Sequence, residues 1–187
     1  ATLLAGSLFT DDSIGGGTFG FTDVNTGTTN RTVTVSGVTV TDGNSGANYD
    51  VTYTANSTST INPYVLNLSG TRVYDGTKNA LASDLSAASF VETETVLLSG
   101  TGSVVTEHVG VSKAVTIGSL VLADGANGGK ASNYTLTGGT HALTVTAAPI
   151  TIGTTNVVKT YDANNSALGS ATLLAGSLFT DDSIGGG

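Results

Sequence analysis

The chain carries the same 17-residue sequence twice, as ATLLAGSLFTDDSIGGG at residues 1–17 and again at residues 171–187. Seventeen identical positions exclude a chance match, so the chain spans slightly more than one period of a tandem repeat with an offset of 170 residues. Repeats of this kind are built from small units that follow one another along the chain. The chain is therefore expected to fold as copies of a small unit and not as one large globule.

A weaker repeat lies inside this period. Residues 31–43 align without gaps with residues 113–125, at an offset of 82 residues. Other matched positions have offsets of 85 to 87 residues, which indicates short insertions in the loops. These positions are Asn48-Tyr49 with Asn133-Tyr134, Pro63 with Pro149, and Tyr74-Asp75-Gly76 with Tyr161-Asp162-Ala163.

Two diverged modules of about 85 residues, here called A and B, therefore alternate along the chain. With boundaries at the two prolines, residues 64–149 are a complete module B. Residues 1–63 are the C-terminal part of module A, and residues 150–187 are the N-terminal part of the next module A. Because both ends fall inside a module, we expect this chain to be one stretch of a longer array.

The composition indicates β-structure. The chain has 33 Thr, 19 Ser and 26 Gly, its charged fraction is only 11%, and its hydrophobic fraction of 39% is too high for a disordered chain. In residues 32–35 and 38–41, valine alternates with threonine, as in a strand with one buried and one solvated face. Gly37 interrupts this alternation and predicts a bulge or tight turn that resets the buried face.

Further strands are expected between clusters of Asp, Asn and Gly. Six to eight short strands in about 85 residues fit a small two-sheet sandwich, so we predict an all-β fold of tandem Ig-like β-sandwich modules strung end to end as a rod. A solenoid with rungs of about 20 residues is the alternative, but no repeat has that spacing. Residues 79–88 and 166–178 lack β-branched runs and are expected to form turns or short helices. The expected strands are residues 50–60, 64–68, 95–106, 113–122, 133–146 and 156–161.

Charge and residue content exclude several functions. With a net charge of -8 and no basic stripe, the chain has nothing to neutralise a phosphate backbone, so no nucleic-acid partner is expected. Without cysteine it has no disulfide, thiolate metal site or catalytic thiol, and no apolar run approaches the ~20 residues of a membrane span. His108 and His141 have no third ligand at metal-binding spacing, and no nucleophile motif accompanies them. We expect neither an enzyme nor a cofactor.

Calcium is the one ion that the sequence leaves open. Asp11-Asp12, repeated as Asp181-Asp182, places two carboxylates side by side, and calcium takes six to eight oxygen ligands. None of the acidic loops has the spaced Asp-x-Asp-x-Asp pattern with a trailing Glu. Ordinary Asp/Gly turn chemistry is the other reading of these pairs and of the remaining acidic loops, at Asp42, Asp75, Asp124 and Asp162.

The repeated motifs resemble a known family. A Val-Tyr-Asp-Gly-Thr sequence at 73–77 opens a module, a Lys/Arg-x-Val-Thr strand lies in its middle, and Asn-Tyr-Thr-Leu and Ala-Pro-Ile-Thr-Ile follow near its end. Together they resemble the YDG-type repeats of large bacterial surface adhesins and filamentous haemagglutinin-like exoproteins, which group with bacterial Ig-like modules. The resemblance implies a secreted, rod-like protein without catalytic residues. Ala163 departs from the motif, so its turn must be accessible to alanine or differ in shape.

Structural roles are expected for the repeated motif residues. Each Asp of the Tyr-Asp motifs is expected to bond backbone amides of the following turn, each Asn-Tyr pair to begin a strand, and each proline to stiffen a joint between modules. These residues are Tyr74, Asp75, Gly76, Tyr161, Asp162, Asn48, Tyr49, Asn133, Tyr134, Pro63 and Pro149.

The sequence thus predicts a structural repeat unit of a filament or giant adhesin stalk at the bacterial cell surface, which provides length, surface attachment or matrix cohesion. The alternative is a repeated ligand-binding module, lectin-like or ice-binding, that acts by avidity. The expected partners are neighbouring copies of the same repeat, in which residues 150–187 of one chain complete residues 1–63 of another through open sheet edges.

Overall fold

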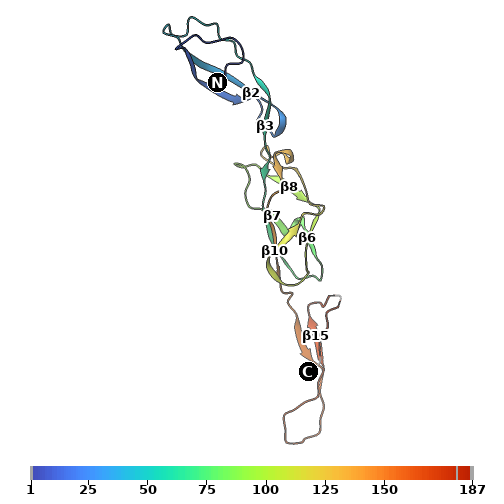
Figure 1. Ribbon diagram of the computed structural model, residues 1–187. Coiled ribbons are helices and arrows are strands. Elements are labelled where there is room, and N and C mark those ends of the chain that lie inside the picture. Colours follow the sequence, from blue (N-terminus) through green and yellow to red (C-terminus); the bar gives the residue numbers. More distant parts are fainter. Residues whose placement is uncertain (1, 180, 186–187) are drawn as a thin grey trace. The chain divides into compact units, whose positions relative to one another are not determined.

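The computed structural model describes residues 2–179 and 181–185 (Figure 1). These residues form fifteen β-strands and two short 3-10 turns, η1 (Ala82–Asp84) and η2 (Ala131–Asn133), which confirms the all-β fold. Their contacts group into two compact units, residues 2–64 with 132–134, and residues 65–131 with 135–185. No helix in the described part of the chain is long and apolar enough to span a membrane.

The first unit is built on a three-stranded antiparallel sheet in the order β1-β2-β3. Strand β1 (Ser13–Phe21) and the long central strand β2 (Gly27–Thr41) form a hairpin, and β3 (Asn56–Ile61) pairs with the other edge of β2. The strand expected over residues 50–60 therefore begins later than predicted, at Asn56. In the described structure β3 is an edge strand, with β2 as its only neighbour in this sheet.

Gly37 resets the buried face of β2 without the predicted bulge. The pairing of β1 with β2 keeps one register on both sides of the glycine, with Gly16 opposite Val38 and Thr18 opposite Ser36. Val33 and Val35 before Gly37, and Val38 and Val40 after it, are all half-buried, while the residues between them are exposed. Both halves of β2 therefore turn their valines to the same side.

The second unit is built on a six-stranded sheet in the order β6-β9-β10-β13-β5-β7. The pair of β13 and β5 is parallel, with consecutive partners from His141 and Leu68 to Thr146 and Val73, and the other pairs of this sheet are antiparallel. A separate antiparallel pair joins β8 to β11. The strands between residues 64 and 146, including those just named, are β4 (Tyr64–Val65), β5 (Leu68–Val73), β6 (Asn79–Leu81), β7 (Leu85–Ala87), β8 (Val96–Ser99), β9 (Thr101–Val104), β10 (Gly110–Thr116), β11 (Val121–Asp124), β12 (Tyr134–Thr135) and β13 (His141–Thr146).

The buried apolar side chains of the described residues all lie between residues 66 and 145. No described residue of the ranges 2–65 and 146–185 is buried. Since burying a leucine or valine side chain contributes about 1.5–3 kcal/mol, most of the chain's stability is concentrated in this stretch. The buried apolar residues are Leu66, Leu68, Ala80, Leu85, Val104, Val115, Leu120, Tyr134, Leu136, Leu143 and Val145.

After residue 150 the chain forms one hairpin, of β14 (Thr151–Thr154) and β15 (Ala171–Ala175), which pair antiparallel. The strand predicted over residues 156–161 is wrong, because residues 155–170 contain no strand. A β-pattern forms a strand only against a neighbouring edge, and this segment has none among the described residues. Of the two stretches expected to form turns or short helices, residues 79–88 include η1, whereas residues 166–178 include β15.

Candidate functional site: the two Tyr-Asp turns

The first Tyr-Asp turn follows strand β5 directly. The Asp75 carboxylate accepts hydrogen bonds from the backbone amide and the hydroxyl of Thr77, both at 2.9 Å. Gly76 between them has a left-handed φ of 72°. An aspartate that bonds the backbone two residues ahead, followed by a residue in the left-handed region, is a compact turn that the sequence specifies locally. The predicted role of Asp75 in the turn therefore matches its contacts.

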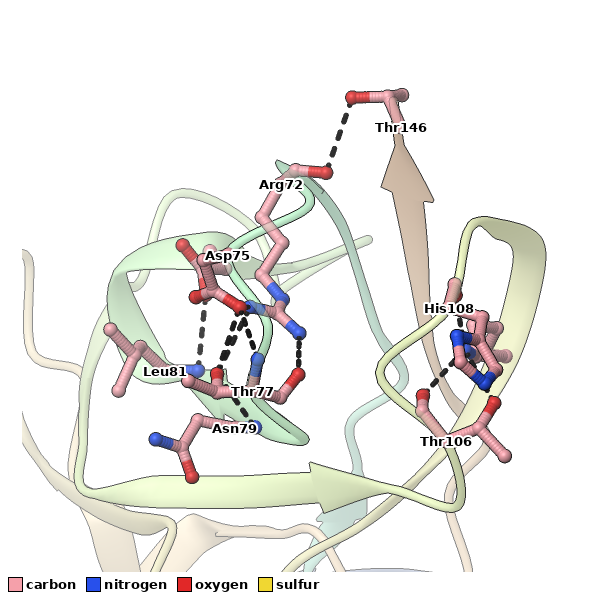
Figure 2. Close-up of polar contacts among 10 residues, drawn as sticks. Arg72, Asp75, Thr77, Asn79, Leu81, Thr106, His108 and Thr146 are labelled. Atoms are coloured by element: carbon pink, nitrogen blue, oxygen red, sulfur yellow. Dashed lines mark hydrogen bonds and ion pairs between the residues drawn. The ribbon is translucent and has the colours of Figure 1, made fainter. Parts of the chain in front are cut away.

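Arg72 anchors this turn to the sheet (Figure 2). Its side chain is buried, its guanidinium forms an ion pair with Asp75, and it donates to the Thr77 carbonyl oxygen and, at 3.2 Å, to the Thr77 hydroxyl. On its backbone side, the Arg72 carbonyl accepts the Thr146 hydroxyl at 3.3 Å. One arginine thus joins the turn to the parallel pair β5 and β13.

The charge of Asp75 is stabilised in this arrangement. Partial burial raises the pKa of the Asp75 carboxyl, but the Arg72 guanidinium and the amide and hydroxyl of Thr77 lower that pKa by more in total. The net result is a pKa below the ordinary aspartate value. The carboxylate therefore remains ionised and bonded at neutral pH.

The second turn reproduces the first with different residues. Lys159 takes the place of Arg72: its ammonium lies 2.9 Å from the Asp162 carboxylate and donates to the Asn164 carbonyl oxygen at 2.8 Å. The Asn164 amide donates to Asp162 at 3.2 Å, as the Thr77 amide does to Asp75. Ala163 has a φ of 57°, so alanine adopts the left-handed conformation here and the turn keeps its shape.

The tyrosines of the two turns lie in different surroundings. The Tyr74 ring packs edge-on against Phe179, with ring centroids 5.4 Å apart and planes at 90°, and its hydroxyl lies 3.5 Å from the Asp182 carboxylate. Tyr161 is 90% exposed. The sequence places both tyrosines in equivalent positions, but only Tyr74 has an aromatic partner among the described residues.

The two Asn-Tyr pairs hold loops in place. The Tyr49 hydroxyl donates to the Asp12 carboxylate and accepts the Phe9 amide at 3.0 Å, and the bond to Asp12 raises the pKa of the Tyr49 phenol. The Asn48 side-chain oxygen accepts from the Asn44 amide group at 2.8 Å.

In the second pair, Asn133 accepts the Thr26 amide at 3.0 Å and donates to Asn25 at 3.1 Å. Tyr134 is buried and packs edge-on against Tyr64, with ring centroids 6.0 Å apart. Pro63 and Pro149 are exposed and precede β4 and β14.

The acidic pairs form one turn in both sequence copies. Asp11 and Asp181 each have a φ of 74°, and the amides of Asp12 and Asp182 donate to the carbonyls of Phe9 and Phe179 at 3.1 and 2.9 Å.

Protein groups already bind one carboxylate of each acidic pair, since Asp12 accepts the Tyr49 hydroxyl and Asp182 the Phe179 amide at 3.3 Å. Among the described residues no three acidic, His or Cys side chains gather as a metal site would require. Calcium at these positions stays a prediction.

The sequence reading did not identify Arg72 and Lys159 as parts of the turns. The available signal was a basic residue two positions before each Tyr-Asp pair. A second role of basic residues was not predicted either. Arg31 and Lys113, aligned in sequence, close the loops before them: Arg31 binds Asp23 at 2.7 Å, and Lys113 donates to the Thr106 hydroxyl at 2.9 Å.

Comparison with known proteins identifies one domain. A YDG domain is found at residues 57–142, a range that contains the Tyr74-Asp75-Gly76 turn and the buried apolar side chains of the described residues except Leu143 and Val145. No curated protein matches the chain. No solved structure matches it either.

Proposed function

We propose that the chain, with its YDG domain at residues 57–142, is a stretch of a tandem array that serves as a structural stalk. In this proposal module B (residues 64–149) alternates with module A, which is represented by residues 1–63 and 150–187. Each module is a small Ig-like β-sandwich, and the modules are strung end to end as a rod. The array supplies length to a secreted filament or adhesin at the bacterial cell surface, for attachment or matrix cohesion and without catalysis.

The observation that carries this proposal is the position of the core. Every buried apolar side chain of the described residues lies between residues 66 and 145, inside the one module that the repeat arithmetic makes complete. The flanking sequences carry the same turns without a buried core. A sequence that repeats a self-contained unit of this size serves length, avidity or surface coverage.

The polar groups of the turns support a structural role. Asp75 is bound by Arg72 and Thr77, and Asp162 by Lys159 and Asn164, so each acidic group is used inside its own turn. A catalytic group or ligand-binding group needs a free atom directed at a substrate. Both turns are thus built from their own polar groups, and the first of them ends strand β5.

A repeated ligand-binding module is the alternative. The threonines of β2 that face away from the valines would be an ice-binding surface, and Gly37 keeps them on one side of the strand. Two of their hydroxyls, however, bond to the neighbouring strand: Thr39 to the Gly15 carbonyl at 3.0 Å and Thr34 to the Gly20 carbonyl at 3.4 Å. These internal bonds favour the stalk over the ice-binding face.

Arrays of one, two and four 170-residue periods test the proposal. Because each period adds two modules to the proposed rod, small-angle X-ray scattering should show a maximum dimension that grows in proportion to the number of periods. A dimension that stays nearly constant with copy number contradicts the rod. A glycan array and an ice-recrystallisation assay should both be silent, and a positive result in either favours the alternative. Antibody labelling of intact producing cells tests the surface location.

A further inference from the structure

The two copies of the repeated sequence share one turn, but they differ in whether their first residues form a strand. The turn from Phe9 to Asp12 recurs from Phe179 to Asp182 with the same backbone bond. Residues 172–175 lie in strand β15, whereas the identical residues 2–5 form no strand. The turn is thus set by local sequence, and the strand depends on its neighbour β14, Thr151–Thr154.

Strand β3 has an open edge where its counterpart has a partner. Strand β2 aligns in sequence with β10, and each pairs antiparallel with the next long strand: Arg31 faces Ser59 of β3, and the equivalent Lys113 faces Leu143 of β13. Strand β13 has β5 on its other side, in parallel, whereas β3 has no second neighbour in its sheet among the described residues. The sheet on β3 lacks the equivalent of β5.

The chain contains the missing equivalent of β5 elsewhere. Strand β5 leads directly into Tyr74-Asp75, and residues 155–160 lead in the same way into Tyr161-Asp162. This segment forms no strand, and its Val158 is 95% exposed. Residues 155–160 are therefore equivalent to β5 in sequence, but they do not form part of a sheet.

The valine face of the first sheet is only partly covered. Together with residues 2–8 and 49–56 it lines an open hollow of about 810 Å³. In the second unit the equivalent apolar positions are buried: Leu68, the first residue of β5, is 3% exposed, and Leu66, two residues before it, is 1% exposed. Ile152, which aligns with Leu66 through the matched prolines, is 50% exposed. The hollow is lined on its sheet side by Ile14, Phe19, Val33, Val35, Val38 and Val40.

We propose that residues 151–160 complete the first sheet of the copy of the repeat that follows them, which for the 187-residue chain is a second molecule. Strand β14 exchanges its own β15 for residues 1–5 of the second copy, which have the identical sequence ATLLA. Residues 155–160 then add to the open edge of β3 as a parallel strand, and Ile152 enters the hollow. The hydrogen bonds of β14 to the sequence ATLLA are the same before and after the exchange. The gain in free energy therefore comes from the apolar surface that becomes newly buried in the hollow.

Assembly of this kind is open-ended. Each copy offers one donor segment and one acceptor sheet on different parts of its surface, so the contact is heterologous and gives head-to-tail oligomers whose size depends on concentration. The inference uses the sequence repeat on which the proposed function also rests. It does not use the surface location or the stalk role, and the length-per-period measurement above is unaffected by its failure.

The repeated sequence supplies a matched pair of variants. Leu3→Pro and Leu173→Pro are the same substitution in the same local sequence, and each removes one backbone donor. Leu3 lies outside any strand and is 46% exposed, so Leu3→Pro leaves the monomer intact but blocks the intermolecular strand. Leu173 pairs with Ile152, so Leu173→Pro releases β15 and frees β14 for the second copy.

Sedimentation velocity over a concentration series measures the oligomeric state of the unaltered chain and of both full-length variants. The unaltered chain should form oligomers as its concentration rises, and Leu3→Pro should raise the concentration needed by at least about tenfold. Leu173→Pro should lower that concentration. A monomer at all concentrations for the unaltered chain, or equal effects of the two substitutions, overturns the proposal. Circular dichroism should show that Leu3→Pro retains its strands and that Leu173→Pro loses no more than the β14–β15 hairpin.

Disulfide trapping tests the strand register, because the chain has no cysteine of its own. Thr71 faces Thr144 in the β5–β13 pair, and the equivalent of Thr71 before the second Tyr-Asp turn is Val158. Ser59 faces Arg31 as Leu143 faces the equivalent Lys113, so by sheet register the counterpart of Thr144 is Thr60. Neighbouring strands lie ~4.8 Å apart, within disulfide reach. A mixture of Val158→Cys and Thr60→Cys chains should therefore form mixed disulfide dimers under mild oxidation.

A control variant separates specific pairing from random collision. Val105 is 81% exposed, similar to Val158, but lies outside the donor segment. Val105→Cys mixed with Thr60→Cys should form the mixed dimer at least about tenfold more slowly, as collision alone allows. Equal rates for the two mixtures overturn the proposed register and the proposal with it.

Discussion

Gly17 and Gly37 fall opposite each other in the β1–β2 hairpin, between the pairs Gly16–Val38 and Thr18–Ser36, and both have left-handed backbones, with φ of 98° and 63°. Since the pairing register is the same on both sides of them, the two glycines together turn over both strands without a bulge. The valines on either side of Gly37 consequently share one face. A paired left-handed site can therefore replace a bulge as the device that resets a sheet face.

Alanine at the two positions should have unequal effects. A Cβ at residue 37 meets no atom within 4 Å, so Gly37→Ala carries only the cost of a left-handed alanine, about 1–2 kcal/mol. A Cβ at residue 17 would also lie 2.9 Å from Val38 Cγ2, so Gly17→Ala should cost more. Amide hydrogen exchange across β2 should accelerate in both variants, and most in Gly17→Ala.

Gly20→Ala is the control for this comparison. Gly20 lies in the same hairpin, and a Cβ there has no atom within 4 Å. Its exchange rates should remain close to those of the unaltered chain. Protection in Gly37→Ala equal to that in Gly20→Ala would contradict a requirement for a left-handed backbone.

Exchange of glycine and alanine at the third residue of the two Tyr-Asp turns should change the stability of the two turns in opposite directions. Gly76→Ala forces a left-handed alanine and places its Cβ 2.7 Å from Phe179 Cβ, so the variant should be destabilised by more than the ~1–2 kcal/mol that a left-handed alanine alone costs. Ala163→Gly removes the same backbone cost from the second turn and should raise the protection of the Asn164 amide. Chemical denaturation measures the loss of stability in Gly76→Ala, and hydrogen exchange measures the protection of the Asn164 amide in Ala163→Gly.

How far the sequence predicted this structure depends on the range of the interactions. The alternation around Val33 and the Asp75 turn are local, and both were predicted from neighbouring residues. The parallel pairing of β5 with β13 joins residues more than 70 positions apart, and no local pattern encodes it. Arg72 was missed for the same reason, because its burial depends on that distant pairing.

The failed strand over residues 156–161 shows the limit of pattern reading. Valine and threonine in this segment fit a strand, but a strand also needs an edge to pair with. The identical residues 2–5 and 172–175 show the same limit within one chain, since they differ in structure although their sequence does not.

Arg72 and Lys159 should differ in their contribution to stability although they hold equivalent turns. Arg72→Met keeps an apolar stem but leaves the partly buried Asp75 and Thr77 without their donor, at a cost of about 1.5–3 kcal/mol. Lys159 is more exposed, so Lys159→Met should cost less than about 1 kcal/mol. Urea unfolding of both variants measures the difference, and equal losses would contradict the role of Arg72 as the anchor between turn and sheet.

Asp75 should make the stability of the second unit depend on pH. Its pKa in the folded chain lies below the ordinary value of about 3.9, so the unfolded chain takes up the proton first as the pH falls. The contribution of Asp75 is therefore fully present above about pH 5 and is lost as the pH falls through its folded pKa. Asp75→Asn keeps an acceptor for the Thr77 amide but removes the charge, so the free energies of unfolding of the variant and the unaltered chain should converge between about pH 5 and pH 2.

Asp162→Asn provides the matched control for that convergence. The hydrogen bond from Lys159 and the Asn164 amide also lower the pKa of Asp162, but its turn lies in a stretch with no buried residue. Its protonation should therefore leave the urea midpoint of the core between residues 66 and 145 unchanged at every pH. A difference between Asp75→Asn and the unaltered chain that stays constant from pH 7 to pH 2 would show that the ionised form of Asp75 adds nothing to the fold, and the turn would then depend on its backbone bonds alone.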